Sequence, residues 1–172
     1  MAKLTATNAN NNEFFGTSVD VDGDTIVARA SGDDTDSDPN AVVSDVGSAY
    51  VFVNESEGWT QAAELTAEDA DATNRFGYSV ALDGGTIVAG AWSDNRGGNT
   101  DVGSAYVFIR PTACRATATE TVKLTDPDGA ALDQFGRPVA VTGDTIVAGA
   151  NRDDHGDITD PGSAYVFSDV VA

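Results

Sequence analysis

The stretch Gly47-Ser-Ala-Tyr-Val-Phe52 decides the fold, because the chain contains it three times. The same residues return at Gly103–Phe108 and at Gly162–Phe167. Apolar residues at both odd and even positions of each copy indicate a strand that is buried on both faces. Self-similarity at a period of roughly sixty residues is typical of a repeat protein, in which each unit buries its apolar surface against its neighbours.

Three other short phrases precede each copy in a fixed order. A Lys-Leu-Thr or Glu-Leu-Thr segment comes first, then a Phe-Gly pair, then a Thr-Ile-Val-Ala run. The length of 172 residues, 41% of them hydrophobic, suits one core. We expect a single domain over residues 1–172, with repeats at approximately 3–63, 64–122 and 123–172. The three phrases begin at Lys3, Phe15 and Thr25, at Glu64, Phe76 and Thr86, and at Lys123, Phe135 and Thr145.

Turn residues divide each repeat into short strands. The run from Ser18 to Asp22 alternates polar and apolar residues and ends at Asp22-Gly23, a pair typical of a two-residue hairpin. The segment 67–75 is too short and too rich in turn-forming residues to predict a helix. Four short strands per unit, with the inner strands buried on both faces, describe a blade of a β-propeller. The sequence therefore predicts an all-β propeller of three four-stranded blades.

The two ends of the chain suggest how such a ring closes. Lys3-Leu-Thr5 is equivalent to the outer strands that begin at Glu64 and Lys123, whereas the third repeat lacks an outer strand of its own. We expect the N-terminal strand to pair with the C-terminal blade, because an unpaired sheet edge invites aggregation. Closure within one chain gives a three-bladed monomer, and closure between two chains gives six blades in a homodimer. The sequence leaves both possibilities open.

The charge of the chain excludes several partners. Its 28 acidic residues outnumber 9 basic ones and give a formal net charge of −19, which disfavours nucleic acids and anionic lipid surfaces. No window reaches the roughly 18 apolar residues of a membrane helix, so we expect no membrane insertion. At about 1 M salt the Debye length falls to roughly 3 Å, which screens the repulsion between the carboxylates. The composition therefore predicts a halophilic protein, although bound divalent cations can also neutralise such a surface.

The repeated phrases resemble a known family. Phe-Gly followed by a strand and then by Ile-Val-Ala-Gly-Ala, at Ile87–Ala91 and Ile146–Ala150, is similar to the FG-GAP repeat of integrin α-chain propellers and of many microbial extracellular proteins. The Gly-Ser-Ala-Tyr-Val-Phe phrase resembles the bacterial and archaeal branch of that family. The resemblance implies a β-propeller with a role in binding or adhesion, often with structural calcium. The first repeat departs from the pattern, since it has Ala28-Arg-Ala30 in place of Ala-Gly-Ala.

Carboxylate-rich loops follow each Ile-Val-Ala strand and are candidate calcium sites. Calcium takes about 6–8 oxygen ligands, which several carboxylates and backbone carbonyls of one loop can supply. The alternative is that these side chains cap turns and accept hydrogen bonds from backbone amides. Further oxygen-bearing pairs precede each Phe-Gly, at Asn8 and Glu13, Asp69 and Asn74, and Asp128 and Asp133. The predicted metal ligands are Asp33, Asp34 and Asp45 in the first loop, Asp94, Asn95 and Asp101 in the second, and Asp153, Asp154 and Asp160 in the third.

Catalytic machinery is sparse in the sequence. His155 is the sole histidine and Cys114 the sole cysteine, so a Ser-His-Asp or Cys-His site would depend on one residue. Paired acids such as Asp153-Asp154 leave open a hydrolase that acts on polysaccharide. Trp59 and Trp92 can either stack on sugars or fill gaps between blades.

Together these features predict a function in binding and no enzymatic activity. We expect a calcium-assisted binding or adhesion module of a halophilic protein, located at the cell surface or outside the cell, with a protein or a glycan as its partner. Two alternatives stay open. One is the polysaccharide hydrolase with paired aspartates, and the other is a structural fragment of a larger repeat protein. Fold alone does not name the ligand.

Overall fold

The computed structural model describes residues 1–9, 13–30, 46–56, 58–110 and 116–170. In this part of the chain the regular elements are all strands, and none of the described residues forms a helix long and apolar enough to cross a membrane. The strands are β1 (Val19–Asp22), β2 (Thr25–Ala30), β3 (Ser48–Glu55), β4 (Gly58–Leu65), β5 (Ser79–Asp83), β6 (Thr86–Ala91), β7 (Ser104–Ile109), β8 (Ala116–Ala118), β9 (Val122–Leu124), β10 (Phe135–Thr142), β11 (Thr145–Ala150) and β12 (Ser163–Ser168).

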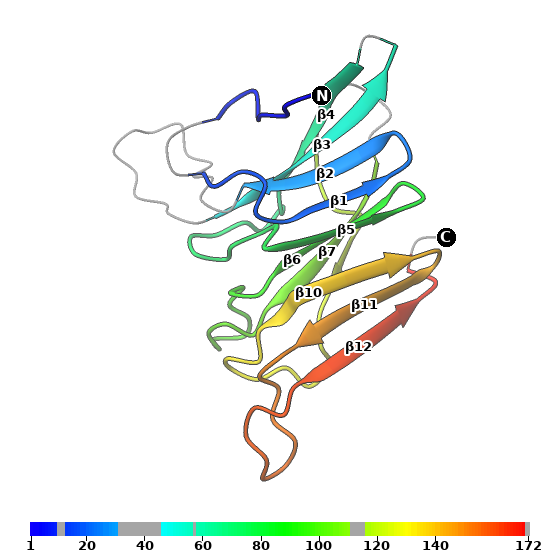
Figure 1. The fold of residues 1–172 in the computed structure, drawn as a ribbon. Helices are drawn as coiled ribbons and strands as arrows, with labels where there is room; N and C mark the ends of the chain where they lie inside the picture. The colour runs from blue at the N-terminus through cyan, green and yellow to red at the C-terminus, as the bar shows by residue number, and fades with distance from the viewer. Residues whose placement is uncertain (10–12, 31–45, 57, 111–115, 171–172) are drawn as a thin grey trace.

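These strands form three sheets that are stacked in the order of the repeats (Figure 1). The first sheet has the order β1-β2-β3-β4-β8, the second β5-β6-β7-β9 and the third β10-β11-β12. All neighbouring strands are antiparallel except β4 and β8, which are parallel. The all-β architecture with one sheet for each repeat is confirmed. The expected outer strands are β4 and β9, while β8 adds a further strand to the first sheet.

Each sheet begins with a tight hairpin, as the sequence predicts. Asp22 pairs with Thr25, so the loop residues are Gly23 and Asp24, one position later than the predicted Asp22-Gly23 pair. Gly23 has a φ of 55°, which a glycine adopts without steric cost. The second and third sheets repeat the two-residue loop, with Asp83 paired to Thr86 and Thr142 paired to Thr145.

The Phe-Gly phenylalanines pack against the phrase that decides the fold. The ring of Phe76 lies 5.4 Å from that of Tyr106 and 5.8 Å from that of Phe108, both in edge-on geometry. Such aromatic pairs contribute about 0.5–1.5 kcal/mol beyond the area that they bury. Phe15 packs edge-on against Phe52 and in a tilted geometry against Tyr50, and Phe135 packs edge-on against Tyr165 and Phe167.

Apolar side chains fill the space between consecutive sheets, because the inner strands carry them on both faces. Val27 and Val51 of the first sheet share a buried cluster with Ile87 and Phe108 of the second. Val88, Val107 and other residues of the second sheet share the next cluster with residues of the third, such as Ile146. A third cluster, around Tyr50 and Phe52, lies under the N-terminal residues Leu4 and Ala6.

Backbone contacts fix the spacing of the sheets. The amide of Phe76 donates to the carbonyl of Val46 at 2.8 Å, and that of Phe135 donates to the carbonyl of Val102 at 2.9 Å. A Cβ atom on Gly103 would lie 2.1 Å from the carbonyl oxygen of Phe135, so only glycine allows this approach. The glycine of the repeated Gly-Ser pair is therefore a requirement of stacking.

Polar residues of β1 face the second sheet. The amide of Leu82 donates to Asp20 Oδ2 at 2.8 Å, and the amide of Gly84 donates to Asp22 Oδ2 at 2.9 Å. The next junction repeats the second of these bonds, from the amide of Gly143 to Asp83 Oδ2 at 2.6 Å. Side chains that the alternating pattern placed on one face thus bind backbone amides of the following repeat.

The predicted pairing of the N-terminal strand with the C-terminal blade is not present within this chain. Leu4 and Ala6 pack on the first sheet, and the amide of Thr7 donates to Gln61 Oε1 at 2.9 Å. In the described part of the chain, β12 pairs with β11 alone. The first and third sheets lie at opposite ends of the stack, which separates the N-terminal segment from β12 (Figure 1). Within the described residues the three sheets therefore form an open stack, and closure between two chains stays a prediction.

Candidate functional site

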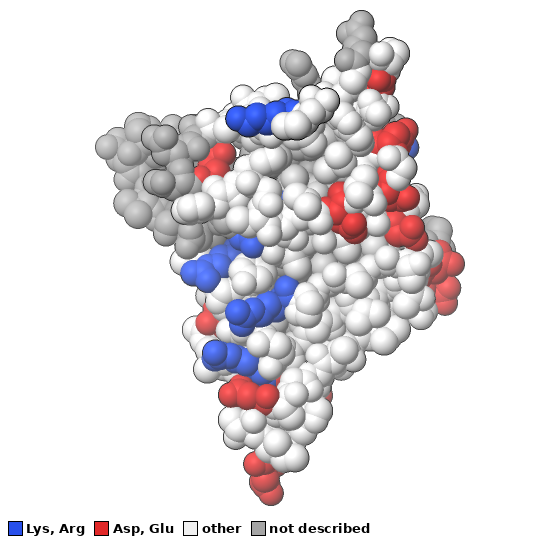
Figure 2. Space-filling model, in the orientation of Figure 1, with Lys and Arg blue, Asp and Glu red and all other residues white. Residues whose placement is uncertain are grey.

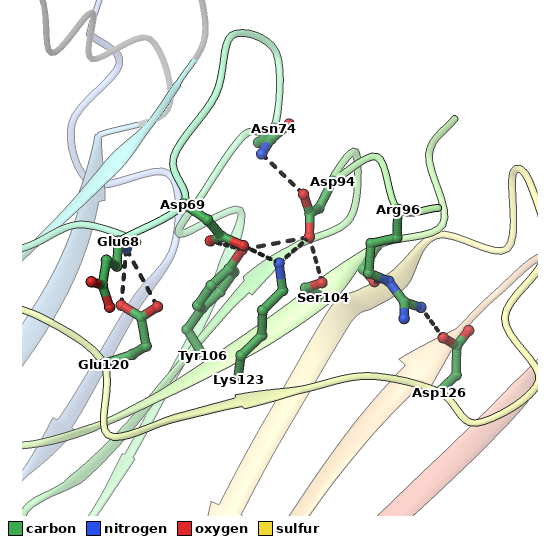
Figure 3. Close-up of polar contacts among 11 residues, drawn as sticks. Glu68, Asp69, Asn74, Asp94, Arg96, Ser104, Tyr106, Glu120, Lys123 and Asp126 are labelled. Carbon is green, nitrogen blue, oxygen red and sulfur yellow. Dashed lines mark hydrogen bonds and ion pairs between the residues drawn. The ribbon is translucent and has the colours of Figure 1, made fainter. Parts of the chain in front are cut away.

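In the second carboxylate-rich loop, a lysine binds the first predicted calcium ligand. Asp94 is 3% exposed, and its Oδ1 accepts a hydrogen bond from Asn74 Nδ2 at 3.0 Å. Its Oδ2 accepts one from Ser104 Oγ at 2.5 Å and lies 2.7 Å from Lys123 Nζ (Figure 3). Both oxygens of this predicted calcium ligand are thus engaged by donors of the protein, and Lys123 supplies the positive charge.

Lys123 also binds Asp69, which precedes the Phe-Gly pair of the second repeat. Its Nζ lies 2.5 Å from Asp69 Oδ2 and 5.0 Å from the centre of the Tyr106 ring. Tyr106 donates from its hydroxyl to Asp69 Oδ1 at 2.9 Å. Burial alone would raise the pKa of Asp69, but hydrogen bonds from Lys123 and Tyr106 and the charge of Lys123 outweigh it and lower the pKa. Burial opposes the charge on Lys123, yet hydrogen bonds to Asp69 and Asp94 raise its pKa.

Two other predicted ligands, Asn95 in the second loop and Asp154 in the third, cap turns. The amide of Asp101 donates to Asn95 Oδ1 at 2.9 Å, and the amide of Asp160 donates to Asp154 Oδ1 at 2.8 Å. Asp101 and Asp160 both have a positive φ, of 52° and 55°. This repeated arrangement is the turn-capping alternative that the sequence left open.

The third loop gathers acids without a lysine. The hydroxyl of Tyr165 lies 2.9 Å from Asp128 Oδ1 and 2.9 Å from Asp153 Oδ2. Asp133 is 3% exposed and accepts a hydrogen bond from the amide of Ala130 at 2.6 Å. Burial, and then the charges of nearby acids including Asp153, raise the pKa of Asp133 despite that bond.

The structure does not assemble a metal centre from the described residues. Within them, no group of three or more His, Cys, Asp or Glu side chains is placed to hold a metal ion. Asp33, Asp34 and Asp45 of the first loop lie outside the described residues. Calcium binding by the nine predicted ligands stays a prediction.

His155 contacts a serine and an acid, although not in the geometry of a nucleophilic triad. Its Nε2 lies 2.6 Å from Ser163 Oγ and 3.7 Å from Asp153 Oδ2. In a triad the acid holds Nδ1 while Nε2 faces the serine. Here both contacts fall on the same nitrogen, so Asp153 does not orient the ring as that chemistry requires.

Three arginines from three repeats converge on two aromatic rings. We call this group, Arg29, Arg75, Arg137, Tyr78 and Trp92, the arginine cluster. The guanidinium carbon of Arg29 lies 4.7 Å from the centre of the Tyr78 ring, and that of Arg75 lies 4.9 Å from the centre of the Trp92 ring. Arg137 lies near both rings, at 5.8 Å from Tyr78 and 5.4 Å from Trp92. The two rings meet edge-on at 5.8 Å.

Hydrogen bonds hold two of these guanidinium groups in place. Arg29 Nη1 donates to the carbonyl oxygen of Tyr78 at 2.8 Å, and Arg137 Nη1 donates to Gln134 Oε1 at 2.5 Å. Arg29 is 5% exposed, whereas the other members of the cluster are half-buried. The indole Nε1 of Trp92 is buried and has no acceptor among the described residues. An unsatisfied buried donor of this kind costs about 1–3 kcal/mol.

The cluster lies at the end of the sheets where β5 and β10 begin. Tyr78 directly precedes β5, Trp92 directly follows β6, and Arg137 lies in β10. Figure 2 shows basic side chains gathered on the corresponding side of the molecule, while many acids follow the opposite edge. On this face of the molecule the basic side chains are thus grouped, although the chain has only 9 basic residues against 28 acidic ones.

Only part of this site was predicted from the sequence. It marked Arg29 as a departure from Ala-Gly-Ala and Trp92 as an aromatic with two possible roles, but it did not single out Arg75, Tyr78 or Arg137. The usable signal is that these positions differ among the repeats. Thr17 and Arg137 stand where Tyr78 does, and Gly90 and Gly149 stand where Arg29 does.

Comparison with known proteins agrees with the repeats. No curated protein matches the chain. The model of a family described as the FG-GAP repeat matches residues 1–52, 59–108 and 118–167, which confirms the resemblance carried by the Phe-Gly and Gly-Ser-Ala-Tyr-Val-Phe phrases. These matches cover most of the chain, and each contains the three strands that begin one sheet. The chain therefore belongs to the FG-GAP repeat family and is a β-propeller repeat module.

Proposed function

We propose that this module is a non-enzymatic binding or adhesion module that holds an anionic group of a protein or glycan partner on the arginine cluster. The observation that supports the proposal is the convergence of Arg29, Arg75 and Arg137 on the rings of Tyr78 and Trp92. Positions that repeat build the sheets, whereas this site occupies positions that differ among the repeats. Such positions are free to serve recognition.

The chemistry of the cluster favours a carboxylate or a sulfate as the ligand group. A guanidinium presents a planar set of donors that matches these anions, often through two parallel hydrogen bonds. The face of Trp92 lies against Arg75 and Arg137, so the ring supports guanidinium groups rather than a sugar. Cation–π contacts restrict the guanidinium groups before a ligand arrives, which lowers the entropic cost of binding.

The charge of the whole chain fits such a site in a saline environment. A net charge of −19 repels anions at low ionic strength. At about 1 M salt the Debye length of roughly 3 Å removes this long-range repulsion and leaves the short contacts of a half-buried site. We therefore also propose that the protein is halophilic and lies at the cell surface or outside the cell.

Calcium enters the proposal only for the first loop. In the second repeat both oxygens of Asp94 are engaged, and Lys123 lies where a cation would have to bind. That donor set does not fit calcium. Asp33, Asp34 and Asp45 lie outside the described residues. Because Asp36 and Asp38 lie between them in the sequence, structural calcium at the first loop stays in the proposal. Unfolding temperatures with calcium and with a chelator, in concentrated potassium chloride, test this part.

Binding of two carboxylate polymers tests the main proposal. Polygalacturonate represents an acidic glycan and polyglutamate an acidic protein segment, with neutral dextran as the uncharged control. We expect one of the polymers to bind in concentrated potassium chloride, and Arg75→Gln or Arg137→Gln to weaken its binding roughly tenfold, the effect of losing a charged hydrogen bond. An unchanged length of the polygalacturonate after incubation would agree with a module that lacks hydrolase activity.

A matched variant controls for charge. Arg110→Gln removes the same charge at the hairpin end of the sheets, where Arg110 Nη1 bonds to Thr25 Oγ1 at 2.6 Å. We expect this variant to bind as the unchanged protein does. If Arg110→Gln and Arg137→Gln weaken polymer binding equally, net charge alone explains the weaker binding and the proposal is contradicted. The absence of binding to both polymers would also contradict it.

A further inference from the structure

Two sheet faces at opposite ends of the stack lack a neighbour in the described part of the chain. On the first sheet, Val19 and Val21 are 60% and 61% exposed. Their equivalents on the second sheet, Val80 and Leu82, are 7% and 5% exposed because the first sheet covers them. The outward face of the first sheet thus presents apolar side chains that are buried in the next repeat.

The outward face of the third sheet shows the complementary pattern. Val166 of β12 is 65% exposed, whereas its equivalents Val51 and Val107 are 0% exposed under the following sheet. β12 also has an unpaired edge within the described residues, since its single partner is β11. In the second sheet the equivalent edge of β7 is paired with β9.

The N-terminal segment already lies where the outer strand of a preceding sheet belongs. Leu65 and Leu124 lie in outer strands, and each packs into the cluster that joins its sheet to the next one. Leu4 is their equivalent in sequence and packs on the first sheet in the same way, beside Tyr50 and Phe52. No described strand pairs with Leu4, so the segment has the position of an outer strand without the sheet to which it would belong.

The third repeat has the acids that bind Lys123 in the second repeat, but it lacks an equivalent lysine. In the second repeat, Lys123 lies between Asp69 and Asp94 and pairs with Tyr106 across the strands. The third repeat places Asp128 and Asp153 around Tyr165 in the same relation. Among the described residues no lysine or arginine pairs with either acid. Lys3 is the residue equivalent to Lys123.

We propose that a second copy of this chain docks on the third sheet, with its residues 3–5 added to the edge of β12 as an antiparallel strand. The pairing of Tyr106 with Lys123, Ala105 with Leu124 and Val107 with Val122 sets the register. The Lys3 ammonium of the second copy then lies between Asp128 and Asp153. In the same register Leu4 faces Ala164, and Ala2 faces Val166.

Docking of this kind buries both exposed faces at once. The third sheet of one copy covers Val19 and Val21 of the other, as the first sheet covers Val80 and Leu82 within the chain. Within one chain the N-terminal segment packs on the first sheet, at the opposite end of the stack from β12, so the contact forms between two copies (Figure 1). A head-to-tail interface that repeats twice closes a ring, here of six sheets in two copies.

The mass of the unchanged protein in concentrated potassium chloride is the first test. We expect a species of twice 17.7 kDa that dissociates on dilution. Lys3→Glu places a third negative charge beside Asp128 and Asp153, and we expect it to weaken dimerisation roughly tenfold or more. Arg110→Glu makes the same change of charge beside Asp24 and Thr25, at the hairpin of the first sheet, and should dimerise as the unchanged protein does. A monomer at all concentrations, or a dimer indifferent to Lys3→Glu, would overturn the proposal.

The first repeat suggests a rescue. There Glu64 stands at the position of Lys123, and Asn8 Nδ2 donates to Glu64 Oε2 at 3.4 Å. Lys3→Glu combined with Asp128→Asn recreates this pair between the two copies. We expect the double variant to recover most of the lost dimer. No recovery would argue against contact between Lys3 and Asp128.

Disulfide cross-linking tests the register without disturbing Lys3. In a Cys114→Ser background, Ala2→Cys with Val166→Cys places the two thiols on directly opposed residues, where the Cβ separation of about 4.5–5.5 Å permits a disulfide after slight adjustment. We expect oxidation to give a linked dimer. Thr5→Cys with Val166→Cys is out of register and should link poorly. A disulfide within a single chain would show that the second copy is not the occupant. Equal cross-linking of both cysteine pairs would contradict the proposed register.

Discussion

Lys123 Nζ lies 2.7 Å from Asp94 Oδ2, which joins an outer strand to the loop that follows an inner strand of the same sheet. The pair connects β9 to the residues after β6, although β7 lies between these strands in the sheet. Asp94 has a side chain only 5% exposed, and that of Lys123 is 26% exposed. Lys123 therefore supplies the counter-charge to a buried carboxylate.

Removal of this lysine is expected to destabilise the second repeat. Lys123→Met keeps the apolar stem but leaves Asp94 buried without its counter-ion. Breaking a buried pair costs about 3–5 kcal/mol, and partial exposure of the lysine reduces the expected loss to about 2–3 kcal/mol. Urea unfolding in concentrated salt measures it. A loss below about 0.5 kcal/mol, the usual range for surface substitutions, would show that the pair contributes nothing to stability.

The pH dependence of unfolding offers a second view of the same network. The pKa of Lys123 is raised, so its stabilising effect is complete below the unfolded value of about 10.4 and is lost as pH rises through the folded pKa. The pKa of Asp69 is lowered, so its contribution is present above about 3.9 and is lost as pH falls through the folded pKa. We expect Lys123→Met to flatten the stability profile at both extremes. If the stability of Lys123→Met varies with pH as that of the unchanged protein does, Lys123 is not the cause of the pH dependence.

Asp133→Asn is expected to stabilise the third repeat at neutral pH. The raised pKa of Asp133 means that its charged form is disfavoured in the folded state, so the carboxylate reduces stability above its folded pKa. Asn74 stands at the equivalent position of the second repeat and donates to Asp94 Oδ1 at 3.0 Å. The variant offers the same bond to Asp153. Thermal unfolding should show a higher midpoint at pH 7 and little difference at pH 3, and a lower midpoint at pH 7 would refute the argument.

Arg29→Gly restores the Ala-Gly-Ala pattern of the other repeats and is nevertheless expected to destabilise the protein. It removes the bond from Arg29 to the carbonyl oxygen of Tyr78 and the contact with the Tyr78 ring. These interactions together contribute on the order of 2 kcal/mol. Denaturant unfolding measures the change, and binding of the carboxylate polymers should weaken in parallel. A more stable variant would mean that the arginine is retained at a cost to the fold.

Gly103→Ala is expected to disrupt the contact between the second and third sheets. The new Cβ would lie 2.1 Å from the carbonyl oxygen of Phe135, at a φ of +90°, so the expected destabilisation is more than about 3 kcal/mol. Gly97→Ala is the matched control. Gly97 also has a positive φ, of +60°, but a Cβ there meets nothing within 4 Å, so the expected loss is about 1 kcal/mol. Thermal unfolding measures both changes. An equal loss of stability in the two variants would mean that backbone strain alone, and not the contact with Phe135, destabilises Gly103→Ala.

The fold could be predicted from the sequence because its determinants are repeated. Burial of both faces is visible in Thr-Ile-Val-Ala and in Ala-Tyr-Val-Phe, and three concordant copies remove the ambiguity of a single apolar run. The hairpin loops were placed within one residue. The closure was harder, since it depends on where the N-terminal segment lies when the first and third sheets occupy opposite ends of the stack.

The candidate sites were less predictable, because they depend on which side chains meet across sheets. The acidic loop that recurs after each Ile-Val-Ala strand predicted a cation beside Asp94, but it did not predict that the pairing of β7 with β9 brings Lys123 to this carboxylate. The arginine cluster joins Arg29 to Arg137 through residues of the second repeat, a convergence that no local spacing encodes. Differences among otherwise equal repeats are the signal that sequence reasoning could use.

The two halves of each junction between sheets lie in consecutive repeats. Val46 and Gly47 meet Phe76, and Val102 and Gly103 meet Phe135, through the same backbone bond. A tandem duplication of about sixty codons therefore produces a new repeat with a Phe-Gly pair near its start and a Val-Gly pair near its end. Each pair meets its counterpart in the neighbouring repeat, so the new repeat packs on both sides without a second mutation. Genes built in this way can gain or lose blades in single recombination events, which leaves the side chains between the repeated phrases free to diverge.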